Sequence, residues 1–125
     1  MRILRKKRLI TLVALLVLAL HFTSADAFTR NFVYDFTHHI PGPVYNGTKS
    51  KINISLKVTS WGSSSFTIKQ VKSGIFSSTT YATKNIAKKN GNKQTISFSN
   101  HGGCQYQFWK ASDGKRIIGT GTIVW

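Results

Sequence analysis

Residues that could bind sugars occupy alternate positions near the end of the chain. Gln105, Gln107 and Trp109 are two residues apart, so on a β-strand they share one face. We predict that Thr120 and Thr122 join them from a neighbouring strand. Amide and hydroxyl groups bind sugar hydroxyls, and an indole ring packs on the flat face of a pyranose. The five residues predict a glycan-binding strip. The alternatives are an ordinary solvent face with one tryptophan, or the inner face of a second sheet.

Lysines form the second candidate site. We predict that three of them share one outer sheet face: Lys51, Lys57 and Lys69. Four more lie in the connecting segment 83–93: Lys84, Lys88, Lys89 and Lys93. Such a cluster attracts polyanions, whereas the alternative is a set of separately solvated side chains. The seven lysines predict a polyanion-binding patch.

The charge balance favours that prediction. The chain has 18 Lys and Arg against 3 acidic residues, all Asp, and a formal net charge of +15. Residues 28–125 keep thirteen of the basic residues and two of the acids, which leaves about +11. Eleven of the thirteen are lysines, which act as hydrated point charges, whereas arginine is the usual bidentate reader of bases. We therefore expect an extracellular polyanion as partner, such as a cell wall polymer or an anionic membrane surface, and no specific nucleic acid. The competing explanation is that the charge only maintains solubility.

Few residues favour catalysis. Cys104 has His101 three residues before it, but the strand pattern puts Cys104 in the core, where a cysteine behaves as an inert apolar residue. A disulfide between two chains is the alternative for a lone cysteine. His38 and His39 are adjacent and point opposite ways on an extended chain, which argues against joint metal ligation.

Glycosidases generally need two carboxylates, and only two aspartates follow residue 27. We predict a protein that is not an enzyme and has no cofactor, no catalytic residue and no metal. The less favoured class is an enzyme or enzyme inhibitor that acts through its loops.

The first 27 residues have the layout of a secretory signal peptide. A basic cluster at 5–8 precedes a largely apolar run at 9–20, and Ala25-Asp26-Ala27 matches a small-x-small cleavage site. The apolar run is short for a bilayer, which needs about 20 residues. We predict a secreted protein, free or associated with the cell wall, whose working part is one domain over 28–125. An uncleaved membrane anchor is the alternative. A single cysteine excludes an internal disulfide, which favours a bacterial source.

The elements that position these residues are predicted to be β-strands. Apolar residues alternate with polar ones over 51–59, and similar runs occur near 32–36, 66–71, 75–82, 96–98, 104–111 and 116–125. A phase slip before Val71 predicts a bulge. The segment 83–93 is expected to be a basic crossover with one short helical turn near 83–90, or to hold a hairpin turn at 90–91. About seven strands predict an all-β fold, a small antiparallel β-sandwich of immunoglobulin-like or Greek-key type, or a small barrel.

Turn sequences indicate a pairing of these strands. A two-residue turn at 113–114 would set 104–109 opposite 118–123, with the rings of Tyr106 and Phe108 over Gly121 and Gly119. A three-residue loop at 101–103 and a loop centred on residue 62 would form hairpins in the same way. This register puts residues 104, 106 and 108 in the core, and residues 105, 107 and 109 on the outer face.

The sequence therefore predicts a secreted, cationic, non-enzymatic domain that binds an anionic or glycan component of a cell envelope. The competing function is an antimicrobial or toxin-like protein that acts on the envelope of competing cells. Both functions require positive charge, so charge does not separate them.

Overall fold

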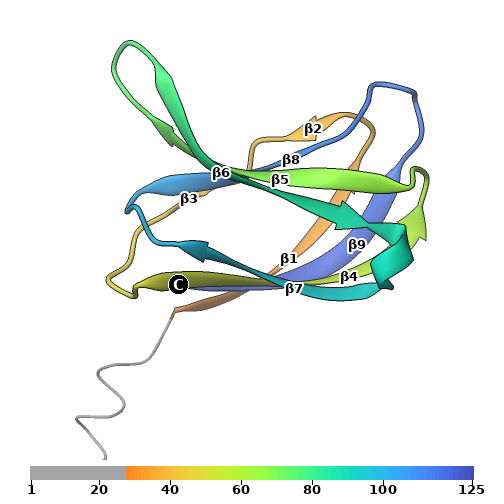
Figure 1. Ribbon diagram of the computed structural model, residues 1–125, viewed down its shortest axis with the longest axis horizontal. Coiled ribbons are helices and arrows are strands. Elements are labelled where there is room, and N and C mark those ends of the chain that lie inside the picture. The colour runs from red at the N-terminus through yellow and green to blue at the C-terminus, as the bar shows by residue number, and fades with distance from the viewer. Residues whose placement is uncertain (1–27) are drawn as a thin grey trace, which may run out of the picture.

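The computed structural model describes residues 28–125, which form two antiparallel β-sheets packed face to face (Figure 1). This arrangement confirms the predicted β-sandwich. The signal peptide predicted over residues 1–27 lies outside the described residues. In the part of the chain that is described, no helix has the length and apolar character needed to cross a bilayer.

The four-stranded sheet has the spatial order β1 (Thr29–Phe36), β9 (Ile117–Val124), β4 (Lys51–Trp61) and β7 (Lys93–Ser99). In the five-stranded sheet, β6 (Ser78–Ala87) pairs with β5 (Ser65–Ser73), which pairs with β8 (Cys104–Trp109). The short strands β2 (His39–Ile40) and β3 (Val44–Tyr45) both pair with the other edge of β8. A 3₁₀ turn, η1 (Lys88–Asn90), leads from β6 toward β7. We call the surface of each sheet that faces away from the other sheet its outer face.

Strand alternation places one side of each strand in the core between the sheets. In β4 every second residue from 52 to 58 is buried, as predicted. In β8 the buried residues are Cys104, Tyr106 and Phe108, also as predicted. Phe66 of β5 stacks on Phe108 with 5.8 Å between the ring centroids. The sequence pattern thus predicted which side of β4 and of β8 is buried.

The predicted hairpins at 62, 101–103 and 113–114 are wrong, because each of these loops crosses from one sheet to the other. β8 pairs with β5, β2 and β3, whereas β9 pairs with β1 and β4. The turn expected at 113–114 also lacks the required backbone. A type I′ turn needs positive φ at both central residues, and Gly114 has it (φ 75°) while Asp113 does not. Within residues 28–125, β5 and β6 form the one hairpin of consecutive paired strands.

Aromatic rings do cover the glycines of β9, but they come from β1. Phe32 is paired with Gly121, and Tyr34 with Gly119, across the β1–β9 ladder. A Cβ atom on Gly119 would overlap the Tyr34 hydroxyl, and one on Gly121 would overlap the ring of Phe32. The rings predicted for this role belong to β8 in the other sheet. The prediction that aromatic rings cover the glycines of β9 was correct, but the strand that supplies the rings was predicted wrongly.

The segment 83–93 remains in strand for longer than predicted. The strand expected at 75–82 begins at Ser78 and continues to Ala87, and the helical turn covers 88–90. The described chain has nine strands instead of seven, because β2 and β3 are separate two-residue strands. The bulge predicted before Val71 is confirmed by the register shift between Gln70 and Val71.

The β5–β6 hairpin extends beyond the body of the sandwich (Figure 1). Ile75 and Phe76 form its tip and are 93% and 98% exposed. The Gly74 N–H donates to the Ser77 carbonyl at 2.7 Å and closes the turn. The hairpin therefore presents two adjacent large apolar side chains to solvent.

Candidate functional site

Short polar side chains form a row across the outer face of the four-stranded sheet. Ser55 of β4 lies between Thr95 of β7 and Thr122 of β9, and Thr122 is paired with Asn31 of β1. The hydroxyl oxygens of Ser55 and Thr95 are 3.2 Å apart, and Thr122 donates to Asn31 Oδ1 at 2.8 Å. Because these side chains are short, an extended ligand can lie across the strands.

The adjacent row contains two lysines directly opposite each other. Lys57 of β4 is paired with Lys93 of β7 on one side and with Thr120 of β9 on the other. Like charges opposite each other destabilise a sheet. Lys88 and Lys89 lie in the 3₁₀ turn that leads into β7. We call Lys57, Lys88, Lys89 and Lys93 the basic patch.

Hydrogen bonds fix the turn that carries half of the basic patch. The Val58 N–H donates to the Asn92 carbonyl at 2.8 Å, and Trp61 Nε1 donates to Asn92 Oδ1 at 2.9 Å. The Lys88 N–H donates to the Ser64 carbonyl at 2.8 Å. The backbone that carries these lysines is therefore bonded to β4 and to the loop that follows it.

Neither aspartate of the described chain neutralises the basic patch. Asp35 forms an ion pair with Arg116, accepting hydrogen bonds from Nε and Nη2. Asp113 accepts hydrogen bonds from Lys110 Nζ and from a backbone N–H of its own loop, and these bonds lower the pKa of Asp113 to about 2. Lys110 is buried and donates to two backbone carbonyls as well, so it has a structural role. The other eleven basic residues of 28–125 have no carboxylate partner.

The predicted glycan strip is divided between the two sheets. Gln105, Gln107 and Trp109 share the outer face of the five-stranded sheet, as predicted. Thr120 and Thr122 lie on the outer face of the four-stranded sheet, because β8 and β9 do not pair. The two threonines therefore lie beside the basic patch, and they do not lie beside Gln105 and Gln107.

The Trp109 ring is engaged from both neighbouring strands. Its Nε1 donates to Gln107 Oε1 at 3.0 Å, and Gln107 in turn donates to Gln105 Oε1 at 3.3 Å. His39 of β2 stacks on the indole with 3.8 Å between centroids, and Lys69 Nζ of β5 lies 4.8 Å from the indole centroid. Partial desolvation and, secondarily, the nearby His38 and Lys69 lower the pKa of His39, which favours the neutral imidazole. Because β2 and β5 flank β8 on opposite sides, little of the indole is left free for a sugar.

The remaining predicted lysines do not share one surface. Lys51 lies on the same strand and the same outer face as Lys57. Lys69 lies on the outer face of the five-stranded sheet, so the common face predicted for these three residues is wrong. Lys84 lies in β6, with its Nζ 6.0 Å from the ring centroid of Phe98.

Cys104, His38 and His101 make contacts that stabilise the fold. Cys104 is 2% exposed, and burial raises the pKa of its thiol. The ring of His101 stacks on Tyr81 with 3.9 Å between centroids, and His38 Nδ1 is 2.7 Å from the Lys110 carbonyl. Among residues 28–125, no three His, Cys, Asp or Glu side chains are grouped as metal ligands.

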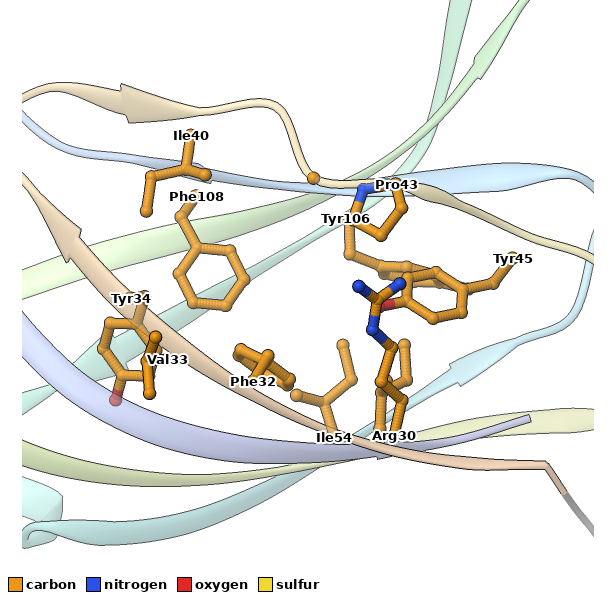
Figure 2. Close-up of a pocket in the computed structure, with 12 residues that line it drawn as sticks. Arg30, Phe32, Val33, Tyr34, Ile40, Pro43, Tyr45, Ile54, Tyr106 and Phe108 are labelled. Carbon is orange, nitrogen blue, oxygen red and sulfur yellow. The ribbon is translucent and has the colours of Figure 1, made fainter.

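A cavity of about 220 Å³ lies between the two sheets, on the side where β1 faces β2 and β3 (Figure 2). Aromatic and aliphatic side chains from both sheets line it, among them Phe32, Ile54 and Phe108. The exposed Arg30 lies on its solvent side. This cavity is separate from both sets of predicted site residues.

Arg30 and the hairpin tip are not among the predicted site residues, although each has a signal in the sequence. Arg30 is in phase with Phe32 and Tyr34, and this period of two puts its side chain on the inner side of β1. Ile75 was interpreted as the start of a strand, but Ile75-Phe76 lies between turn-forming residues. The cavity had no sequence signal, because it depends on how the two sheet edges approach each other.

No protein-family model matches this chain, and no curated protein sequence matches it. Among solved structures, a chain from the Bacillus endospore appendages, which form disulfide-linked pili, is similar with a TM-score of 0.46 and 16% identity, over 80% of this chain and 88% of that one. PliG of Aeromonas hydrophila, a periplasmic inhibitor of g-type lysozyme, has a TM-score of 0.44 and 9% identity, over 78% and 86% of the two chains. PirA has a TM-score of 0.38 and 13% identity, over 78% and 89%. Likeness at this level assigns no function. By its own structure the described chain is a small, cationic, two-sheet β domain.

Proposed function

We propose that the protein is a secreted, non-enzymatic binding protein for an anionic polymer of a cell envelope, which it binds through the basic patch. The observation that carries the proposal is the pairing of Lys57 with Lys93. Two lysines directly opposite each other cost stability in a sheet, and no aspartate of residues 28–125 offsets them. A bound row of phosphate groups would remove this repulsion.

The surroundings of the lysine pair suit a phosphate-bearing chain. Thr120 lies beside Lys57, and Ser55 and Thr95 lie in the next row. Lysine supplies charge, and hydroxyl groups donate hydrogen bonds to phosphate oxygens. Successive phosphates of a polymer such as teichoic acid could contact Lys93, Lys57 and Thr120 in turn across the strands.

A glycan is the second ligand class within this proposal, at the outer face of the five-stranded sheet. Gln105 and Gln107 offer amide groups there, both half-buried on one strand. The basic patch is the better candidate, because His39 and Lys69 already engage the ring of Trp109.

The proposed place of action is outside the cytoplasm, either free or bound to the cell wall. The support is the signal-peptide layout of residues 1–27. Mass spectrometry of the exported protein tests this step. A mature chain that begins at Phe28 supports it, and a chain retained in the cytoplasm with residues 1–27 attached contradicts it.

The binding experiment compares intact cell walls with walls stripped of teichoic acid, each at about 0.05 and 0.5 M salt. We expect binding that is lost on stripping and weakens with salt, since exposed charges are screened within about a Debye length. The Lys57→Gln/Lys93→Gln double variant should bind at least about tenfold more weakly at low salt and with a smaller salt dependence.

The matched control is Lys69→Gln/Lys84→Gln, which removes the same charge from the five-stranded sheet. Equal loss in both double variants would show that diffuse charge, and no patch, carries the binding. Salt-resistant binding to stripped walls would contradict the basic patch as the binding site and would favour a glycan ligand on the surface that contains Gln105 and Gln107.

A membrane-directed function, in an antimicrobial or toxin-like protein, is the second candidate, and the hairpin tip favours it. Ile75 and Phe76 are almost fully exposed on a projecting hairpin of a strongly cationic protein. Apolar side chains that enter the lipid interface next to positive charge bind anionic bilayers. Dye release from anionic vesicles by the natural protein, lost in Phe76→Ser, would support this function. Intact vesicles at saturating protein would exclude it.

A further inference from the structure

The side of the sandwich between β1 and the β2–β3 edge is not closed by hydrogen bonds. Among residues 28–125, β1 pairs with β9 alone, and β2 and β3 pair with β8 alone. Pro41 and Pro43 lie between β2 and β3, and proline has no N–H to donate to a neighbouring strand. A ligand can therefore enter between these two edges without breaking a backbone hydrogen bond of the described chain.

The cavity behind this opening is apolar and reaches the core. Figure 2 shows Phe32, Phe108 and Ile40 around one end and Tyr45 and Tyr106 at the other, with Ile54 below. Ile54 is 1% exposed, so the floor of the cavity is the inner surface of β4. Gly42 (φ 64°) approaches the Tyr106 carbonyl so closely that a Cβ atom would be 2.8 Å from that oxygen, so position 42 cannot carry a side chain that fills the space. An apolar lining of this kind favours an apolar ligand.

One positive charge faces this cavity. Arg30 of β1 has its guanidinium beside Tyr45, at the end of the cavity where Tyr106 also lies (Figure 2). Both aspartates of residues 28–125 form ion pairs elsewhere, so Arg30 has no carboxylate partner. An arginine can bind a carboxylate through two nitrogens at once, as Arg116 does with Asp35. Arg30 could bind the carboxylate of a ligand in the same way.

We propose that this cavity binds a small amphipathic carboxylate, with its apolar tail between the sheets and its carboxylate on Arg30. The volume sets the size of the tail. A cavity of about 150 Å³ holds benzene, so about 220 Å³ accommodates a tail on the order of eight to ten carbons. The site shares no residue with the basic patch, and it stands or falls independently of polymer binding.

The test uses octanoate and octan-1-ol, which have the same tail and differ in charge. Each is titrated into the purified protein and followed by ¹⁵N and ¹³C NMR. We expect octanoate to bind about tenfold more tightly than octanol, because a charge-assisted hydrogen bond to arginine forms only with the carboxylate. Chemical shifts should change at Phe32, Tyr45 and Tyr106. Arg30→Gln should bind both ligands with equal affinity.

Two further variants separate the cavity from general charge. Lys72→Gln removes a positive charge from β5 and should leave the octanoate to octanol ratio unchanged. Ile54→Phe fills the floor and should weaken both ligands together. If that core variant does not fold, Ile40→Trp at the rim blocks the opening instead.

Three results would overturn the proposal. The first is no binding of octanoate at 10 mM, and the second is an Arg30→Gln protein that keeps the preference for octanoate. The third is a set of shift changes confined to the outer sheet faces, which would mean that octanoate binds to surface lysines.

Discussion

The Lys57–Lys93 pair predicts that one substitution will raise stability and weaken binding at the same time. In Lys93→Gln the amide keeps most of the side-chain length, and the repulsion with Lys57 disappears. Opposed residues of a sheet have Cβ atoms about 5 Å apart, and two ammonium groups about 7 Å apart repel by about 0.6 kcal/mol in water. We therefore expect Lys93→Gln to stabilise the fold by about 0.3–0.6 kcal/mol at low salt.

The assay is thermal and urea unfolding at about 10 mM and 1 M salt. For a domain of this size the expected gain corresponds to a rise in Tm of about 1–5 °C. At 1 M salt the screening length falls to about 3 Å, so the gain should vanish. In the same preparation, binding to the polyanion should weaken.

Lys51→Gln is the matched control, because Lys51 lies on the same strand and face but is paired with Ser99. It removes the same charge from the whole protein without relieving an opposed pair. If Lys93→Gln and Lys51→Gln changed stability equally, or if the gain persisted at 1 M salt, the reasoning from the cross-strand pair would be refuted.

Three other predictions concern the fold. Gly119→Ala should destabilise by about 1–3 kcal/mol in urea unfolding, because its Cβ atom would overlap the Tyr34 hydroxyl, whereas Gly114→Ala tests only the cost of positive φ. Trp109→Ala should cost less than the 3–5 kcal/mol typical of a core tryptophan, since the ring is on an outer face, and a larger loss would contradict that position. The pKa of Asp113 is depressed to about 2 when folded, so its contribution to stability is present above about pH 4 and is lost as the pH falls toward 2. Unfolding measured from pH 5 to 2 should therefore show a steeper loss for the natural protein than for Asp113→Asn.

The strand interiors were predictable because a period of two is a local property. Residues 52–58 and 104–108 each show which side is buried, whatever strand lies beside them. The pairing of strands was not predictable from the same signal. A crossover between sheets buries Tyr106 as well as a hairpin does, and short turn sequences such as Asp113-Gly114 do not distinguish the two.

For the candidate site, too, the sequence predicted which residues of one strand share a face, but it did not predict which strands are neighbours. Gln105, Gln107 and Trp109 were correctly placed together because they belong to one strand. Thr120 was assigned to the wrong neighbours because that step required the pairing. The lysine pair could be found only from the structure, since β4 and β7 are more than thirty residues apart in the sequence.

The position of β9 has a consequence for how the chain folds. Among the strands of residues 28–125, β9 comes last along the chain, yet it lies between β1 and β4 and is the one partner of β1. The four-stranded sheet therefore cannot assemble progressively from the N-terminus, and most of its pairings close long loops, which makes folding slow. Only the β5–β6 hairpin can form early from neighbouring residues. A chain truncated before Ile117 would leave β1 without its partner and β4 without one of its two neighbours, so we expect premature termination to yield an unfolded product rather than a smaller domain.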